Sequence, residues 1–130
     1  MQDLMPEQAA RVLREQAEAL LIDCRSETEF YFVGHALGAH HVAWSDGQDW
    51  ELNPHFVDEV RQLADARLDR PLLLMCRSGT RSVKAAQALE AAGFNRVINV
   101  LDGFEGQLDE QNHRGLLGGW RHAGLPWEQS

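Results

Sequence analysis

Residues 72–82, LLLMCRSGTRS, place residue types that can do chemistry directly after an apolar run. Cys76 stands at the junction and is followed by two arginines, two serines, a threonine and a glycine. A cysteine near arginines at the start of a helix has a lowered pKa, and the thiolate is its reactive form. A packed strand-end cysteine is the alternative, since free cysteine is commonly buried. The basic, glycine-containing surroundings favour a nucleophile.

The rest of the loop has the features of an anion site. CRSGTR, residues 76–81, is predicted to turn between a strand and a helix, where successive N–H groups can form a nest for an anion. Gly79 permits the torsions of a tight loop, and the helix N-terminus adds partial positive charge. The side-chain donors and cations of the segment are Arg77, Ser78, Thr80, Arg81 and Ser82. One loop would then hold the nucleophile, its activation and its substrate site.

Alternating elements position this loop. Short apolar runs predict strands at residues 19–23, 39–44, 71–76 and 96–101. Helices are predicted at 6–16, 53–68 and 80–94, with a short one from the capping-box pair Ser26 and Glu29 to about Val33. This pattern predicts an α/β fold with a parallel sheet covered by helices on both faces. Active sites of such sheets lie at the carboxyl ends of strands, where Cys76 falls.

The helical patterns specify faces. Helix 53–68 has Asn53 as its predicted N-cap. Its apolar stripe is Phe56, Val57, Val60, Leu63 and Ala64. In helix 80–94 the residues at helical spacing are Val83, Ala86, Leu89 and Glu90, and Gly93 closes the helix. The glycine-rich tail is predicted to form turns with short helical pieces between them.

Composition excludes several classes of protein. The 130 residues suggest one domain over 1–130, and the net charge of −8 argues against non-specific binding to nucleic acid or an anionic membrane. The two cysteines form no CxxC pair, so a disulfide scaffold is not indicated. No signal peptide or membrane-length apolar run is recognised, and a cytoplasmic location is expected. The scattered histidines predict no metal site.

CRSGTRS after an apolar strand resembles the active-site loop of the rhodaneses, a family of sulfurtransferases. LLIDCRSETEFYFVGHALGAHHVAW, residues 20–44, resembles their N-terminal signature. VINVLDGFEG at 97–106 and GGWRHAGLPW at 118–127 resemble the later family motifs in the expected order. The resemblance covers most of residues 20–127.

The resemblance implies a rhodanese-like domain without a metal or organic cofactor. Cys76 would accept a sulfane sulfur from thiosulfate or another persulfide donor, and pass it to cyanide or a thiol. The main-chain N–H groups of residues 77–81 would bind the persulfide and the anionic donor. The identity of a protein acceptor stays open.

Two departures from the family pattern concern the acceptor. Asp102 stands where the family more often has glycine, and residues 107–117 look like an insertion, interpreted as a solvated loop. One alternative is a phosphatase or arsenate reductase of the related Cys-loop-Arg type. Those enzymes have five residues between cysteine and arginine, whereas four separate Cys76 from Arg81. The other alternative is a non-catalytic rhodanese-like binding module, which the presence of Cys76 disfavours.

Outside the loop, the remaining cysteine, charged residues, histidines and tryptophans are interpreted as structural residues and not as catalytic ones. Cys24 is predicted to be core, because it ends a strand at a position where the rhodanese resemblance implies an aliphatic residue; a resolving role would require its sulfur to approach Cys76, which the sequence does not show. Asp23 and Arg25 are expected to hold neighbouring loops, and His35 to be a hydrogen-bonded structural residue. His40 and His41 are adjacent in a strand and face opposite sides, which does not suit a metal. The tryptophans at 44, 50, 120 and 127 are interpreted as packing residues, and Trp44 and Trp120 are the candidates for the rim of the pocket if the fold is as predicted. An exposed, low-pKa thiolate can be free, persulfidated or oxidised.

Overall fold

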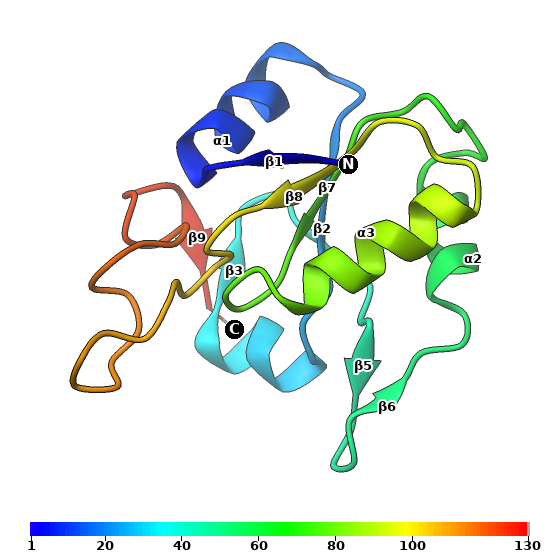
Figure 1. Cartoon of the computed structure of the whole chain (residues 1–130). Coiled ribbons are helices and arrows are strands. Elements are labelled where there is room, and N and C mark those ends of the chain that lie inside the picture. The colour runs from blue at the N-terminus through cyan, green and yellow to red at the C-terminus, as the bar shows by residue number, and fades with distance from the viewer. Residues whose placement is uncertain (130) are drawn as a thin grey trace.

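A five-stranded parallel sheet forms the centre of the protein, in a computed structural model that describes residues 1–129 (Figure 1). Its strand order is β1-β8-β7-β2-β4, so β7 is the central strand. The strands are β1 (Gln2–Leu4), β2 (Leu20–Asp23), β4 (His40–His41), β7 (Leu72–Met75) and β8 (Val97–Val100). All four pairings are parallel. Every residue of β2, β7 and β8 is buried, as expected of strands covered on both faces.

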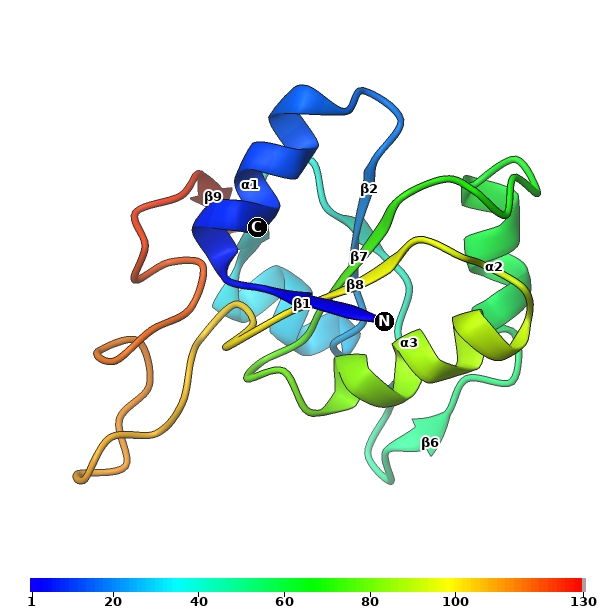
Figure 2. The same cartoon turned by 45° about the horizontal axis from the view of Figure 1, so that its top comes forward.

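Helices cover both faces of the sheet, which confirms the predicted α/β architecture. The helices are α1 (Pro6–Glu15), the single π-helical turn η1 (Glu29–Val33), α2 (Phe56–Leu63) and α3 (Arg81–Ala91). Figures 1 and 2 show α1 on one side of the sheet and α2 and α3 on the other. Within residues 1–129, no helix has the length and apolar character needed to cross a membrane.

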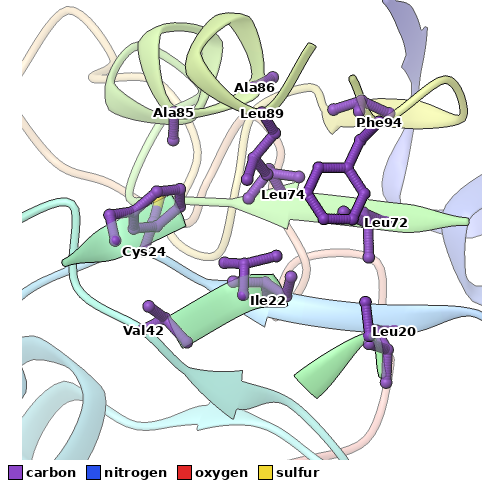
Figure 3. Close-up of a cluster of buried hydrophobic side chains, with 14 of the residues drawn as sticks. Leu20, Ile22, Cys24, Val42, Leu72, Leu74, Ala85, Ala86, Leu89 and Phe94 are labelled. Carbon is purple, nitrogen blue, oxygen red and sulfur yellow. The ribbon is translucent and has the colours of Figure 1, made fainter. Parts of the chain in front are cut away.

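Alternating strand residues divide the core into two clusters. The even-numbered side chains of β2 and β7 pack with α2 and α3, as Figure 3 shows for Ile22 and Leu74 beneath Leu89. Odd-numbered side chains such as Leu21 and Leu73 pack with α1 and the tail. The two-residue period of a strand separates the clusters in this way.

Two small antiparallel pairs complete the structure. β3 (His35–Ala36) pairs with β9 (Trp127–Glu128), which attaches the C-terminal segment behind η1. β5 (Ser45–Asp46) pairs with β6 (Glu51–Leu52), and this hairpin extends from the same end of the sheet as α3 begins (Figure 1).

Several boundaries differ from the sequence predictions. β1 was not predicted, and α2 is shorter than 53–68 at both ends. Asn53 caps the preceding turn and not the helix, accepting the His55 N–H at 3.0 Å, and after Leu63 the helix cannot continue because Asp65 and Ala66 have φ values of 55° and 58°. The tail over residues 101–126 contains turns but no helical pieces. The buried face of α3 is Ser82, Ala85, Ala86 and Leu89. Val83 is only partly buried, and Glu90 is exposed and pairs with the N-terminal amino group at 2.7 Å.

Candidate active site

Cys76 lies at the carboxyl end of the central strand and at the base of a pocket of about 320 Å³. Its exposed fraction is 1%, so the sulfur is buried rather than exposed as the sequence suggested. The pocket is lined by Trp50, Cys76, Arg77, Ser78, Thr80 and Arg81. Within residues 76–81, all except Gly79 therefore line it, and Gly79 contributes through its backbone, whereas Ser82 lies outside this lining.

Gly79 turns the loop back onto the sulfur. Its φ of 102° lies in the region that favours glycine, and its N–H donates to Cys76 Sγ at 3.1 Å. Within the described residues, the N–H groups of Arg77, Ser78 and Thr80 have no protein acceptor. The loop therefore offers further donors to an anion in the pocket, as a backbone nest does.

The segment after β8 holds the loop from behind. Phe104 N–H donates to the Cys76 carbonyl at 2.8 Å, and Glu105 N–H donates to the Arg77 carbonyl at 3.0 Å. A Cβ on Gly103 would lie 2.2 Å from the Cys76 carbonyl oxygen, so only glycine fits there. These contacts position Cys76 through its backbone.

Segment 107–117 is largely exposed but contacts the loop at its first residue. Gln107 Nε2 donates to the Ser78 carbonyl at 2.8 Å. Later in the segment, Asp109 Oδ1 accepts the His113 N–H at 2.8 Å and so closes a local turn. The solvated-loop interpretation holds for most of the segment, while Gln107 supports the site.

Hydrogen bonds lower the pKa of the Cys76 thiol to about 5. The Cys24 thiol contributes most to this lowering, burial opposes it, and the Ser82 side chain, the Ser82 N–H and the Gly79 N–H add to it. The pKa lies well below neutral pH, so Cys76 is a thiolate there. This thiolate adjoins a pocket that is also lined by two arginines, Arg77 and Arg81.

Arg81 is fixed by a carboxylate at the pocket wall. Its two terminal nitrogens donate to the two oxygens of Glu29 at 2.7 and 2.8 Å. Burial alone would raise the Glu29 pKa, but Arg81 and Ser26 lower it to about 2. The predicted capping box is present, since Ser26 Oγ accepts the Glu29 N–H at 3.3 Å and Ser26 N–H donates to Glu29 Oε1 at 3.2 Å. The Trp50 ring lies 5.3 Å from the Arg81 guanidinium carbon.

A family model described as the Rhodanese-like domain matches residues 5–110. The chain belongs to the rhodanese-like domain family. It is 34% identical to the Thiosulfate sulfurtransferase GlpE of Vibrio cholerae, over 94% of this chain and 91% of that protein. It is 28% identical to the Uncharacterized protein RC0915 of Rickettsia conorii over 98% of each. The crystal structure of Rv0390 from M. tuberculosis superposes with a TM-score of 0.88 at 40% identity, covering 100% of this chain and 98% of that one.

The predicted structural residues frame the rhodanese loop. Arg25 is fully buried and donates to both oxygens of Asp23, at 2.9 Å from Nε and 2.6 Å from Nη2, and to the Gly34 carbonyl. His35 Nδ1 lies 2.9 Å from the Phe30 carbonyl oxygen. The structural interpretation of these residues is confirmed. In residues 1–129, no group of three His, Cys, Asp or Glu side chains could hold a metal.

The aromatic residue that lines the rhodanese pocket is Trp50. Trp44 and Trp120 pack in the core, as the packing interpretation expected, and they do not rim the pocket as suggested. Trp44 packs edge-on against Phe56 at 5.3 Å, and Trp120 is buried in the second core cluster. The available signal was the setting of Trp50, a large aromatic residue in the polar stretch SDGQDWE. Its position on the β5–β6 hairpin depends on tertiary folding.

Proposed function

We propose that this protein is a sulfurtransferase that carries a sulfane sulfur as a Cys76 persulfide. The donor is thiosulfate or another persulfide donor, and the acceptor is cyanide or a thiol. The observation that carries the proposal is the Cys76 thiolate, held by the Gly79 N–H at 3.1 Å at the base of a small pocket with Arg77 and Arg81. Its relative in Vibrio cholerae bears the name thiosulfate sulfurtransferase.

The reaction needs no oxidant beyond the donor. The Cys76 thiolate attacks the outer sulfur of thiosulfate, the sulfur–sulfur bond of thiosulfate breaks, and sulfite leaves with the bonding electron pair. Cyanide then attacks the outer sulfur of the persulfide, giving thiocyanate and the original thiolate. The two half-reactions are separate, so the kinetics are of the ping-pong type.

The loop backbone stabilises both charged states. The free N–H groups of Arg77, Ser78 and Thr80 can donate hydrogen bonds to thiosulfate, and then to the negatively charged persulfide. Fixed hydrogen-bond donors stabilise charge in this way in a site shielded from water. The outer sulfur of a persulfide lies about 2 Å beyond Sγ. Since Cys76 is 1% exposed, that extension carries the transferable sulfur toward the pocket mouth.

The loop supports sulfur transfer over phosphate or arsenate chemistry. Four residues separate Cys76 from Arg81, one fewer than in the related phosphatases. We further propose that residues 1–130 act as one rhodanese domain in the cytoplasm, where the two free cysteines would stay reduced.

Intact-protein mass spectrometry after incubation with thiosulfate tests the proposal. We expect wild-type protein to gain the mass of one sulfur atom and to lose it on addition of cyanide. Cys76→Ser, which keeps the loop but not the nucleophile, should gain nothing. Absence of a gain in wild type would overturn the thiosulfate assignment, and an aryl phosphate, arsenate and a persulfide donor would then be compared.

A further inference from the structure

Cys24 and Cys76 occupy equivalent positions at the ends of neighbouring strands. The parallel register of β2 and β7 runs from Leu20 opposite Leu72 to Asp23 opposite Met75, and each cysteine is the next residue. The Cys24 N–H donates to the Met75 carbonyl at 2.9 Å, which continues the ladder. Both side chains belong to the cluster beneath α2 and α3, so the two thiols are neighbours on one face of the sheet; Figure 3 shows Cys24 on this face.

The side-chain donors around Cys76 Sγ are not equally free. Ser82 Oγ lies 3.4 Å from Sγ, but its single proton is donated to Asn99 Oδ1. Asn99 is held in this orientation because its Nδ2 donates to Asp3 Oδ1 at 3.2 Å. Ser82 Oγ can therefore donate to a Cys76 thiolate only by giving up its bond to Asn99, so the part that the Ser82 side chain takes in lowering the Cys76 pKa competes with that bond.

The thiol proton of Cys24 is held less firmly than the hydroxyl proton of Ser82, because its present acceptor is the Met75 carbonyl oxygen. Cys24 Sγ is 3.3 Å from the Met75 carbonyl oxygen, and that oxygen already accepts the Cys24 N–H. A thiol is a weak donor to a neutral carbonyl, whereas hydrogen bonds to a charged acceptor are about twice as strong as neutral ones. Rotation of the Cys24 thiol about its Cβ–Sγ bond would redirect the proton from the Met75 carbonyl toward Cys76 Sγ.

We propose that Cys24 is a positioning residue for the nucleophile, which donates its thiol proton to Cys76 Sγ whenever Cys76 is ionised and returns it to the Met75 carbonyl otherwise. The Gly79 N–H and the Cys24 thiol would then hold the thiolate from two sides. This inference deepens the proposed function, on which it rests for the use of the thiolate.

The surroundings of Cys24 favour a proton donor over a second nucleophile. Cys24 is fully buried, and its pKa is raised well above the ordinary value by the hydrogen bond to Cys76, by burial and by nearby negative charge. A thiol that stays protonated attacks poorly. The charged groups near the pair are Asp23, whose side chain lies on the opposite face of β2 and binds Arg25, and Arg81 from α3, which is paired with Glu29 of η1.

Titration of Cys76 in Cys24 variants tests this inference without any sulfur donor. The measurements are the ultraviolet absorbance of the thiolate and the rate of alkylation by iodoacetamide against pH, with the modified residue identified by mass spectrometry. Cys24→Val fills the site without a donor, and Cys24→Ser keeps a donor in a smaller side chain. We expect Cys24→Val to raise the Cys76 midpoint by about one pH unit, whereas Cys24→Ser stays near wild type.

The two variants separate packing from hydrogen bonding. If packing at residue 24 sets the Cys76 midpoint, Cys24→Ser should shift it more than Cys24→Val, and if the hydrogen bond sets it, Cys24→Val should shift it more. An unchanged midpoint in Cys24→Val, or equal upward shifts in both variants, would overturn the donor role. Val42→Ala removes volume from the same cluster and should leave the midpoint in place. Cys24→Ala replaces Cys24→Val if the latter does not fold, with the same expected shift. A normal titration in a wild type that gains no sulfur from thiosulfate would contradict the proposed function but not this inference.

Discussion

The tripeptide Cys-Arg-Ser occurs twice, at residues 24–26 after β2 and at 76–78 after β7, and its two copies behave in opposite ways. In the first copy Arg25 turns inward and is fully buried against Asp23, and Ser26 closes a capping box with Glu29. In the second copy Arg77 is exposed at the pocket. The cysteine pKa is raised in the first copy and lowered in the second.

The residues that follow each tripeptide account for the difference. Glu27 and Thr28 lead the first copy directly into η1, and Arg25 Nε, Arg25 Nη2 and the Ser26 N–H all donate within the protein, whereas the buried Arg25 Nη1 has no hydrogen-bond partner among the described residues. Gly79 instead reverses the second copy, so that one N–H faces the sulfur and others remain free. The comparison indicates that the backbone geometry after the tripeptide decides whether its cysteine is reactive. Substitutions in the first copy should therefore lower stability, and substitutions in the second should lower sulfur loading.

The largest effect is expected on stability, at the first copy. Asp23→Ala leaves the buried Arg25 without its partner, and breaking a buried pair in this way lowers the unfolding free energy by about 3–5 kcal/mol. Urea denaturation measures the change. Arg77→Ala, the corresponding change in the open copy, should alter stability by no more than about 0.5 kcal/mol. Equal losses in the two variants would remove the distinction between a closed and an open copy.

Gly79→Ala should affect sulfur loading more than stability. The added Cβ has room, since its nearest neighbour is 3.5 Å away, but a φ of 102° is strained for alanine. As the loop relaxes, the N–H leaves Sγ, and we expect the rate of loading from thiosulfate to fall by about 10- to 100-fold. Gly38→Ala is the matched control, because Gly38 has a φ of 81° and open space away from the loop. Loading that survives Gly79→Ala unchanged would show that the N–H is dispensable.

The pH dependence of loading follows from the Cys76 pKa of about 5. Protonation removes the nucleophile, so the loading rate should be constant above about pH 6 and fall about tenfold per pH unit below pH 5. Stopped-flow or quenched loading across this range gives the profile. A loading rate that continues to rise up to pH 9 would mean that Cys76 is no more acidic than an ordinary thiol.

The smallest effect is expected from the exposed arginine of the open copy. Arg77→Ala removes a cation beside the pocket, and we expect loading at low thiosulfate to slow by about 3- to 10-fold, with the difference shrinking as salt is added. Arg11→Ala makes the same change in net charge on the exposed face of α1. If both variants slow loading equally, the overall charge and not the pocket cation is responsible.

Sequence patterns predicted the parts of this structure that depend on local order. Buried runs located β2, β7 and β8, and the loop composition identified Cys76 and the pocket residues around it. Strand β1 was missed because its three residues are partly or fully exposed and show no apolar run. The neighbour relation of Cys24 and Cys76 was also invisible, because it depends on the adjacency and register of β2 and β7. Trp50 reaches the pocket only through the folding of the β5–β6 hairpin.

The burial of Cys76 has a consequence for chemical durability. A bare thiolate oxidised beyond the sulfenic acid is lost to irreversible damage. Once loaded, Sγ would be covered by the loop and by the sulfur it carries, and an oxidant entering the pocket would meet the outer sulfur first. Reductive cleavage of the sulfur–sulfur bond would then restore an undamaged thiolate. The loaded form would thus be the safer storage state of the protein between turnovers.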